Sequence, residues 1–244
     1  MTGLGVVAGL PAEAAPLAGC RPAPGSMIPL AQGGWLAVAG MGPERATQAA
    51  QRLLEQGAGA LASWGTAAGL SPGLRAGTVV LAERILGAGG PFATDARWRG
   101  ALHARLAGSL DLHPGPLVQA SGLLLTAAAK AQLAAASGAA AADLESAAVA
   151  AVAARAGVPM VALRVVADDA ATGLPRAVAE AADERGDVPA RRVLARSLAR
   201  PAGLPELLRL ALAYRQVRRS FRTVRALAGP TLAACRTPRF EDSP

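Results

Sequence analysis

Short apolar runs alternate with helical stretches along most of the chain, and this alternation restricts the folds that it can adopt. The runs have the length of buried strands and end in glycine-rich or polar segments. They cover 4–8, 35–39, 58–63, 78–85, 117–120 and 160–166. Between them the pattern predicts helices over 43–55 and 95–110. Strands that alternate with helices predict an α/β fold, in which a mostly parallel mixed sheet is flanked by helices on both faces.

Two segments between these runs are expected to be irregular. Residues 65–69 read Gly-Thr-Ala-Ala-Gly and are expected to form a turn that closes the third run. Residues 170–188 combine glycine and proline with several acidic residues, and are expected to form a loop with a short helix.

Positive charge is concentrated at the C-terminal end. The 244 residues carry a net charge of +8, but 1–188 carry −1 and 189–244 carry +9. We therefore expect a main domain over 1–188 and a basic helical extension over 189–244. Within the extension, apolar residues recur at spacings of three and four, which predicts an amphipathic helix over 204–228. They are Leu207, Leu210, Tyr214, Val217, Phe221, Val224 and Ala228.

Three roles are open for this helix. Its apolar stripe could pack on the body with a solvated arginine face, lie on an anionic membrane surface, or form a dimeric coil. A basic tail on a neutral body indicates an anionic surface or a partner protein rather than nucleic acid.

Composition excludes several other classes. Two cysteines and two histidines make neither a disulfide framework nor a cysteine- or histidine-rich metal centre. The glycine-rich turns lack the spacing of nucleotide-binding loops, so we expect no cofactor and no metal. No apolar run has transmembrane length, and the first 20 residues lack the basic start of a signal peptide. A cytoplasmic protein is expected, with peripheral association at the inner face of the plasma membrane as a further possibility.

Three carboxylates follow the apolar runs, where an α/β fold binds its ligands. Glu13 lies just past the first run, and Glu145 precedes an alanine-rich helix. Asp168 follows the run over 160–166. Carboxylates at strand ends are costly unless they are solvated or functional. Helix capping by Asp143 and Asp168, and a surface position for Glu13, are the structural alternatives.

Five motifs follow one another along the chain: Gly9-Leu10-Pro11-Ala12-Glu13, Gly40-Met41-Gly42, Gly65-Thr66-Ala67-Ala68-Gly69-Leu70, Asp143-Leu144-Glu145, and Leu163-Arg164-Val165-Val166-Ala167-Asp168. Taken together, they resemble the nucleoside phosphorylase and nucleosidase superfamily from about Leu4 to Asp168. Three segments carry a closer resemblance: 35–45, Trp64-Gly65-Thr66-Ala67, and 143–149. They most resemble the hopanoid-associated phosphorylase group, which is proposed to remove adenine from adenosylhopane.

The resemblance implies a three-layer fold whose catalytic domain, over 1–188, cleaves the N-glycosidic bond of a purine nucleoside. It implies that Asp168 protonates the leaving base at N7 and that Glu13 activates the attacking water. Glu145 would bind the ribose hydroxyls, and Leu144 would lie beneath the sugar. Relatives form dimers or larger oligomers, so a homo-oligomer is expected by analogy.

The remaining site assignments also come from the resemblance. The backbone at Gly65, Thr66 and Ala67 would approach the nucleophile and the ribosyl group. The base pocket would include Ser121, Gly122 and Leu125. The family often has an aromatic residue after this Ser-Gly pair, whereas this chain has only leucines.

The charge pattern favours water over phosphate as the nucleophile. Related phosphorylases place an arginine shortly before the glycine turn, but 61–64 contains none. Glu13 would repel phosphate, and only Arg45 and the hydroxyl of Thr66 could favour it. The alternatives are a methylthioadenosine or S-adenosylhomocysteine nucleosidase, a phosphate-dependent purine nucleoside phosphorylase, and a membrane-bound nucleoside-binding protein without turnover.

Overall fold

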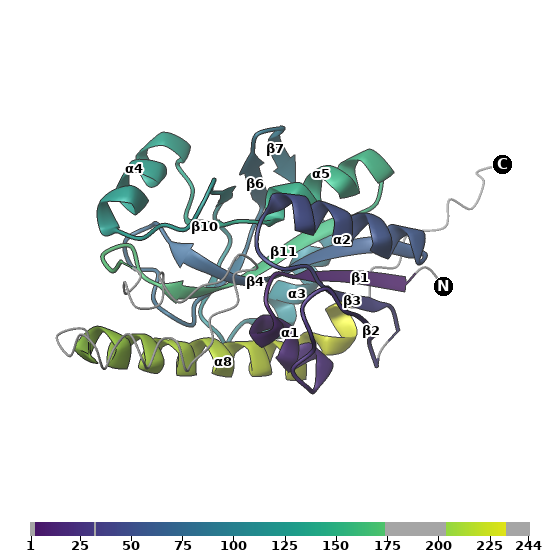
Figure 1. The fold of residues 1–244 in the computed structure, drawn as a ribbon, viewed down its shortest axis with the longest axis horizontal. Helices are drawn as coiled ribbons and strands as arrows, with labels where there is room; N and C mark the ends of the chain where they lie inside the picture. The colour runs from purple at the N-terminus through teal and green to yellow at the C-terminus, as the bar shows by residue number, and fades with distance from the viewer. Residues whose placement is uncertain (1–2, 32, 174–203, 233–244) are drawn as a thin grey trace.

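A mixed sheet with helices on both faces forms the protein (Figure 1). The structure, a computed structural model, describes residues 3–31, 33–173 and 204–232. The strands of this part are β1 (Gly3–Ala8), β2 (Met27–Pro29), β3 (Trp35–Val38), β4 (Ala58–Gly69), β5 (Val79–Leu81), β6 (Arg84–Gly87), β7 (Gly90–Ala93), β8 (Leu112–His113), β9 (Leu117–Gln119), β10 (Ala141–Asp143) and β11 (Met160–Asp168). The helices are α1 (Pro11–Ala18), α2 (Pro43–Glu55), α3 (Ala96–Leu106), α4 (Ala127–Ser137), α5 (Ser146–Ala156) and α8 (Leu204–Leu232). The expected three-layer α/β fold is confirmed.

The long strand β4 joins the two halves of the sheet. It pairs in parallel with β1 on one edge and with β11 on the other. On the edge that pairs with β1, its last two residues, Ala68 and Gly69, pair antiparallel with β10. The register places Ala8 beside Trp64 and Arg164 beside Gly65. The ends of β1 and β10 and the C-terminal half of β11 therefore meet around residues 64–68 of β4.

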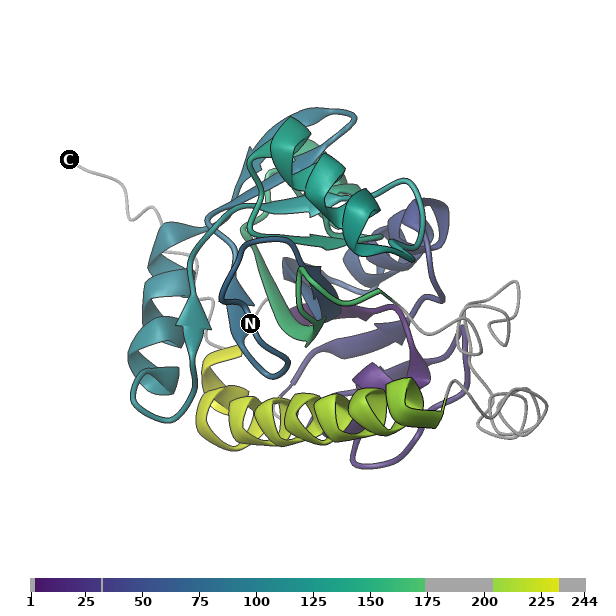
Figure 2. The same ribbon diagram turned by 90° about the vertical axis from the view of Figure 1, so that its left-hand side faces the viewer.

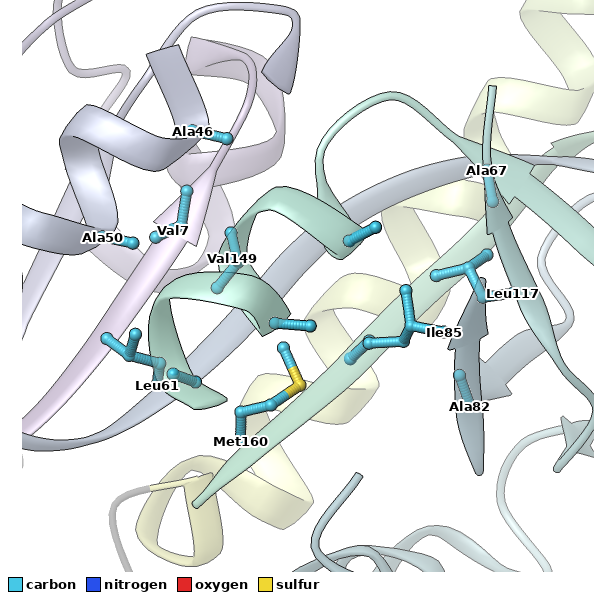
Figure 3. Close-up of a cluster of buried hydrophobic side chains, with 14 of the residues drawn as sticks. Val7, Ala46, Ala50, Leu61, Ala67, Ala82, Ile85, Leu117, Val149 and Met160 are labelled. Carbon is cyan, nitrogen blue, oxygen red and sulfur yellow. The ribbon is translucent and has the colours of Figure 1, made fainter. Parts of the chain in front are cut away.

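Each face of the sheet has its own apolar core. Alanines on α2 and α5 pack closely against Val7, Leu61 and Met160, as Figure 3 shows for Ala46 and Ala50. On the other face, α1, α3 and α8 cover a second core (Figures 1 and 2). Many small side chains let the helices lie close to the sheet, which gives the high alanine content a structural role.

The C-terminal helix α8 is part of this second core. Val217, Phe221 and Val224 are fully buried, and the rings of Phe221 and Trp64 lie with centroids 4.8 Å apart. Packing of the stripe on the body is therefore confirmed for this half of the helix. In the N-terminal half, Leu210 and Tyr214 of the stripe are half-buried. Leu208 and Leu212, which do not belong to the stripe, are 63% and 50% exposed. Across the described residues, no helix is long and apolar enough to span a bilayer.

Some local expectations were wrong. Residues 65–69 continue β4 instead of forming a turn, because β11 and β10 pair with this glycine- and alanine-rich stretch. The apolar run over 78–85 is two strands, β5 and β6, which pair with different neighbours. Most of the loop expected over 170–188 lies outside the described residues. The boundary between the main domain and the extension stays a prediction.

Replacing Phe221 with alanine should destabilise the fold by about 3–5 kcal/mol, because it removes a fully buried ring from the core beneath Trp64. Urea unfolding monitored by circular dichroism measures this loss. Arg222→Ala, at the neighbouring exposed position, should change stability by less than about 0.5 kcal/mol. Equal stability of the two variants would contradict the packing of α8 on the body.

Candidate active site

Glu13 is held at the start of α1 by contacts with β4. Its Oε1 accepts hydrogen bonds from the Thr66 amide at 2.7 Å and the Thr66 hydroxyl at 2.6 Å. Its Oε2 accepts one from the Leu10 amide at 3.0 Å. The Trp64 ring nitrogen donates to the Glu13 main-chain carbonyl at 2.8 Å. The side chain is thus buried and fixed in orientation, rather than placed on the surface.

These bonds leave one direction open on the Glu13 carboxylate. A carboxylate has about four lone-pair sites. Residues of the described part fill three, and the remaining one is on Oε2. Gly9 lies against this oxygen, since a Cβ built there would be 3.4 Å from Oε2 of Glu13 and 3.5 Å from Oε1 of Glu145. The two predicted carboxylates therefore flank the same glycine.

Glu145 lies at the N-cap of α5, directly after β10. Its Oε1 accepts a hydrogen bond from the Gly42 amide at 3.0 Å. Burial raises the pKa of Glu145 to about 7, against the opposing charge of Arg164. The negative charges of Asp143 and Glu13 raise this pKa further, and the bond from Gly42 lowers it. At or above neutral pH this carboxyl group ionises, and the carboxylate can then accept hydrogen bonds from hydroxyl groups.

Beneath these carboxylates lies Arg164, which the sequence did not identify as a site residue. It is 1% exposed, and its Nη2 lies 3.8 Å from Oε2 of Glu145. Its guanidinium donates to Asp143 Oδ2 at 2.5 Å, to Ser63 Oγ at 2.8 Å and to Ser146 Oγ at 3.0 Å. Although burial opposes the charge, its acidic neighbours raise the pKa of Arg164 above the ordinary value, so it remains a cation.

Gly65 separates this cation from Glu13. A Cβ at this position would collide with Nη1 of Arg164 and lie 2.9 Å from Oε2 of Glu13. At Gly65 the backbone therefore lies close to two charged side chains, whereas its approach to a nucleophile and a ribosyl group stays a prediction.

Asp168, at the end of β11, has a buried lysine as its partner. The Nζ of Lys130, on α4, donates to Oδ2 of Asp168 and to the carbonyls of Asp169 at 2.6 Å and Thr172 at 2.8 Å. Burial raises the pKa of Asp168, while the hydrogen bond and charge of Lys130 oppose the shift. Asp168 pairs with Ala68, two residues beyond Thr66 on β4, which corresponds to about 7 Å along the strand.

The other predicted site residues lie outside this contact network. Leu144 is half-buried and packs against the small apolar cluster around Leu70. Ser121, Gly122 and Leu125 are exposed in the loop between β9 and α4. Within the described residues, no hydrogen bond or ion pair joins them to Glu13, Glu145 or Asp168.

Tyr214 connects α8 with the site. Burial raises the pKa of the Tyr214 hydroxyl, and the negative charge of Glu13 acts in the same direction. The helix α8 also packs against α1, which carries Glu13.

Sequence signals existed for two of the residues that were missed. Arg164 is a charge inside an apolar strand, and Lys130 is the only lysine of the chain. Neither signal reveals a partner, because their partners come from distant segments.

The fold is similar to that of several solved structures whose proteins are a hydrolase and nucleosidases. Futalosine hydrolase of Helicobacter pylori is similar, with a TM-score of 0.64 and 17% identity over 94% of this chain and 96% of that one. The 5′-methylthioadenosine/S-adenosylhomocysteine nucleosidase of the same species gives 0.64 and 16%, over 94% and 97%. That of Campylobacter jejuni gives 0.61 and 19%, over 71% and 89%. These likenesses show the fold.

The family follows from the sequence itself. The model of the phosphorylase superfamily matches residues 4–199, and the chain belongs to that superfamily. No curated protein matches it in sequence.

The raised pKa of Glu145 makes stability depend on pH. The folded value of about 7 lies above the ordinary 4.5, so ionisation of Glu145 destabilises the fold increasingly between these values and fully above pH 7. Glu145→Gln should therefore stabilise the protein more at pH 8 than at pH 5, by about 2 kcal/mol. Chemical unfolding at both pH values measures this difference. Glu44→Gln, at an exposed site, should show none, and an equal effect of Glu145→Gln at both values would contradict the account.

Proposed function

We propose that this protein is a purine nucleosidase, which cleaves the N-glycosidic bond of a nucleoside with water. The observation that carries the proposal is the Glu13 carboxylate, held by three hydrogen bonds with one lone pair free beside Glu145. Asp168 pairs with Ala68 of β4, two residues beyond the Thr66 that binds Glu13, so both acidic residues lie against the same end of β4. The solved structures with this fold include nucleosidases, which supports the same class of reaction.

In this proposal Glu13 is the general base. The free direction on Oε2 would receive a proton from the attacking water. The hydrogen bonds from Thr66 and Leu10 stop the carboxylate from turning away, so the water is oriented before the bond breaks. The proton passes from water to Oε2 as the oxygen attacks the ribosyl carbon.

Glu145 binds the sugar, and Asp168 activates the leaving base. Bond cleavage leaves positive charge on the ribosyl ring, which the carboxylates of Glu145 and Glu13 would stabilise. Ionised Glu145 accepts hydrogen bonds from ribose hydroxyls. Protonated Asp168 gives its proton to N7 of the purine, so that the base leaves as a neutral molecule.

Phosphate is disfavoured as the nucleophile despite the buried arginine. Arg164 is a cation close to the site, and the sequence did not place it there. Its guanidinium already donates to Asp143, Ser63 and Ser146. The hydroxyl of Thr66 is likewise used by Glu13. The charge of Arg164 is surrounded by the carboxyl groups of Asp143, Glu145 and Glu13. This excess of negative charge would repel phosphate and admit water.

For the substrate, we propose adenosylhopane, which would give adenine and ribosylhopane. The motifs shared with the hopanoid-associated group support this assignment. Leucines are exposed in two places, Leu208 and Leu212 on α8 and Leu123 and Leu125 in the loop before α4. An apolar group on the 5′ carbon of the ribose would need exposed apolar side chains of this kind.

The same helix supports peripheral binding to a membrane. Over 208–229, α8 carries six arginines and no acidic residue. One precedes Tyr214 and five follow it, and all six are exposed. The buried half of the apolar stripe is not available to lipid, so attraction between arginines and anionic headgroups would provide the binding, with Leu208 and Leu212 at the surface. The arginines are Arg209, Arg215, Arg218, Arg219, Arg222 and Arg225.

Purified protein should release adenine from adenosylhopane in detergent faster than from methylthioadenosine. Asp168→Asn and Glu13→Gln should each lower kcat/KM by about 10²–10⁴-fold, because each removes a proton-transfer group. Glu55→Gln, at an exposed position of α2, should leave kcat/KM unchanged. Chromatography of adenine measures the rates. Turnover of methylthioadenosine alone would move the function to the soluble nucleoside, and absence of any turnover would favour a binding protein.

The membrane proposal predicts sedimentation with vesicles of phosphatidylglycerol at low salt. Reversing two exposed charges, Arg218→Glu with Arg219→Glu, should weaken binding by at least about 30-fold, at about 1 kcal/mol for each basic group lost. The matched control reverses Arg52 and Arg155, on the helices of the opposite face, and should bind as the wild type does. Equal binding to neutral phosphatidylcholine vesicles, or no binding at all, would overturn the proposal.

A further inference from the structure

We propose that Lys130 is a positioning residue for the acid step. It holds Asp168 by Oδ2, and it stabilises the carboxylate that remains when Oδ1 passes its proton to the leaving base. This inference rests on the proposed function, in which Asp168 protonates a purine.

The buried ammonium group of Lys130 has a hydrogen-bond acceptor for each of its three donors. The Lys130 side chain has no exposed surface, whereas that of Asp168 is 17% exposed. An ammonium group has three donors, and burying it is costly unless all of them are used. The acceptors are Oδ2 of Asp168 and the carbonyls of Asp169 and Thr172, so none of the three is left over. Lys130 is therefore fixed, and the pair is reached from the Asp168 side.

The two carboxyl oxygens of Asp168 have different surroundings. Its Oδ2 is used by Lys130, while Oδ1 accepts no hydrogen bond from the residues that the structure describes. The carboxyl group consequently presents Oδ1 as the atom that can face a base. The bonds from Lys130 to the carbonyls of Asp169 and Thr172 also fix the chain that directly follows Asp168, because they join the end of β11 to α4.

The step balances without a further reactant. Before cleavage, Asp168 carries its proton on Oδ1 and Lys130 is an ammonium ion. The O–H bond breaks as the N7–H bond forms, and the electron pair stays on the carboxyl group. The C–N bond breaks towards the base, which leaves neutral. The new carboxylate then lies beside a positive charge that was in place from the start, so this charge stabilises the product side of the transfer more than the substrate side.

Two opposing influences on the pKa of Asp168 support this arrangement. Burial raises the pKa, which keeps the proton available, and the hydrogen bond and charge of Lys130 lower it, which eases its transfer. The other charged group acting on Asp168 is Asp169, which raises the pKa. A proton donor works best when its pKa lies near the working pH.

The test replaces Lys130 with methionine, which keeps the length and removes the charge. At pH 7 we expect kcat/KM to fall about 10- to 100-fold, the worth of one hydrogen bond to a charged group. The high-pH limb of the kcat/KM profile, where Asp168 loses its proton, should move to higher pH, because the lowering influence is gone. Lys130→Arg keeps the charge, so the high-pH limb of its kcat/KM profile should lie at the same pH as in the wild type. Gln132→Met, at an exposed position of α4, is the matched control.

A purely structural lysine gives a different result. In Lys130→Met, kcat/KM would then fall together with stability, and the high-pH limb of the kcat/KM profile would stay at the wild-type pH. That result would overturn the inference. Addition of Lys130→Met to Asp168→Asn should cause no further loss, since Lys130 acts through Asp168. A further loss in the double variant would also overturn it.

A second readout does not need turnover. Carbon NMR titration of the side-chain carboxyl of Asp168 should show a higher pKa in Lys130→Met than in the wild type. If wild-type protein cleaves no nucleoside while this shift is present, the proposed function fails and the Lys130–Asp168 coupling stands. If the titration is the same in both proteins, the inference fails whatever the substrate.

Discussion

The buried guanidinium of Arg164 is the interaction on which the site depends. Asp143 and Glu145 lie at the end of β10, Glu13 lies in α1, and their negative charges would repel one another in a buried space. Arg164 lies among them and donates directly to Asp143, so the negative charge is balanced from the middle of β11. A buried charge that loses its partners is strongly destabilising. The acidic site and this part of the core therefore form one structural unit, and Gly65 leaves the space for it.

The strand β4 carries this unit to the rest of the molecule. Trp64 donates to the carbonyl of Glu13 on one side and packs against Phe221 of α8 on the other. Thr66 fixes the carboxylate of Glu13, and Ala68 pairs with Asp168. A basic helix that looks separate in the sequence is thereby coupled to Glu13, the proposed catalytic base. We infer that α8 contributes to the site through packing, and that its exposed arginines could provide the proposed binding to a membrane.

The sequence predicted the parts of the fold that local patterns determine. The helix α2 has the bounds that the sequence predicted, 43–55, because its initial proline and its regular apolar spacing are both local signals. The carboxylates at strand ends were found because an α/β fold places ligands there. Arg164 was not found, since its partners lie 18 to 101 residues away and a single charge in an apolar run names none of them. The extension of β4 through 65–69 was missed for a related reason: pairing with two other strands overrides the local turn signal of glycine.

The central claim is that water attacks in a site too negative for phosphate, and the response of adenine release to inorganic phosphate tests it most directly. The account predicts the same rate from zero to high phosphate at constant ionic strength, with a free ribosyl sugar as the second product. A rate that rises and saturates with phosphate, with a ribosyl 1-phosphate as the product, would contradict it. That result would mean that Arg164 or another cation reaches the nucleophile despite the three surrounding carboxylates.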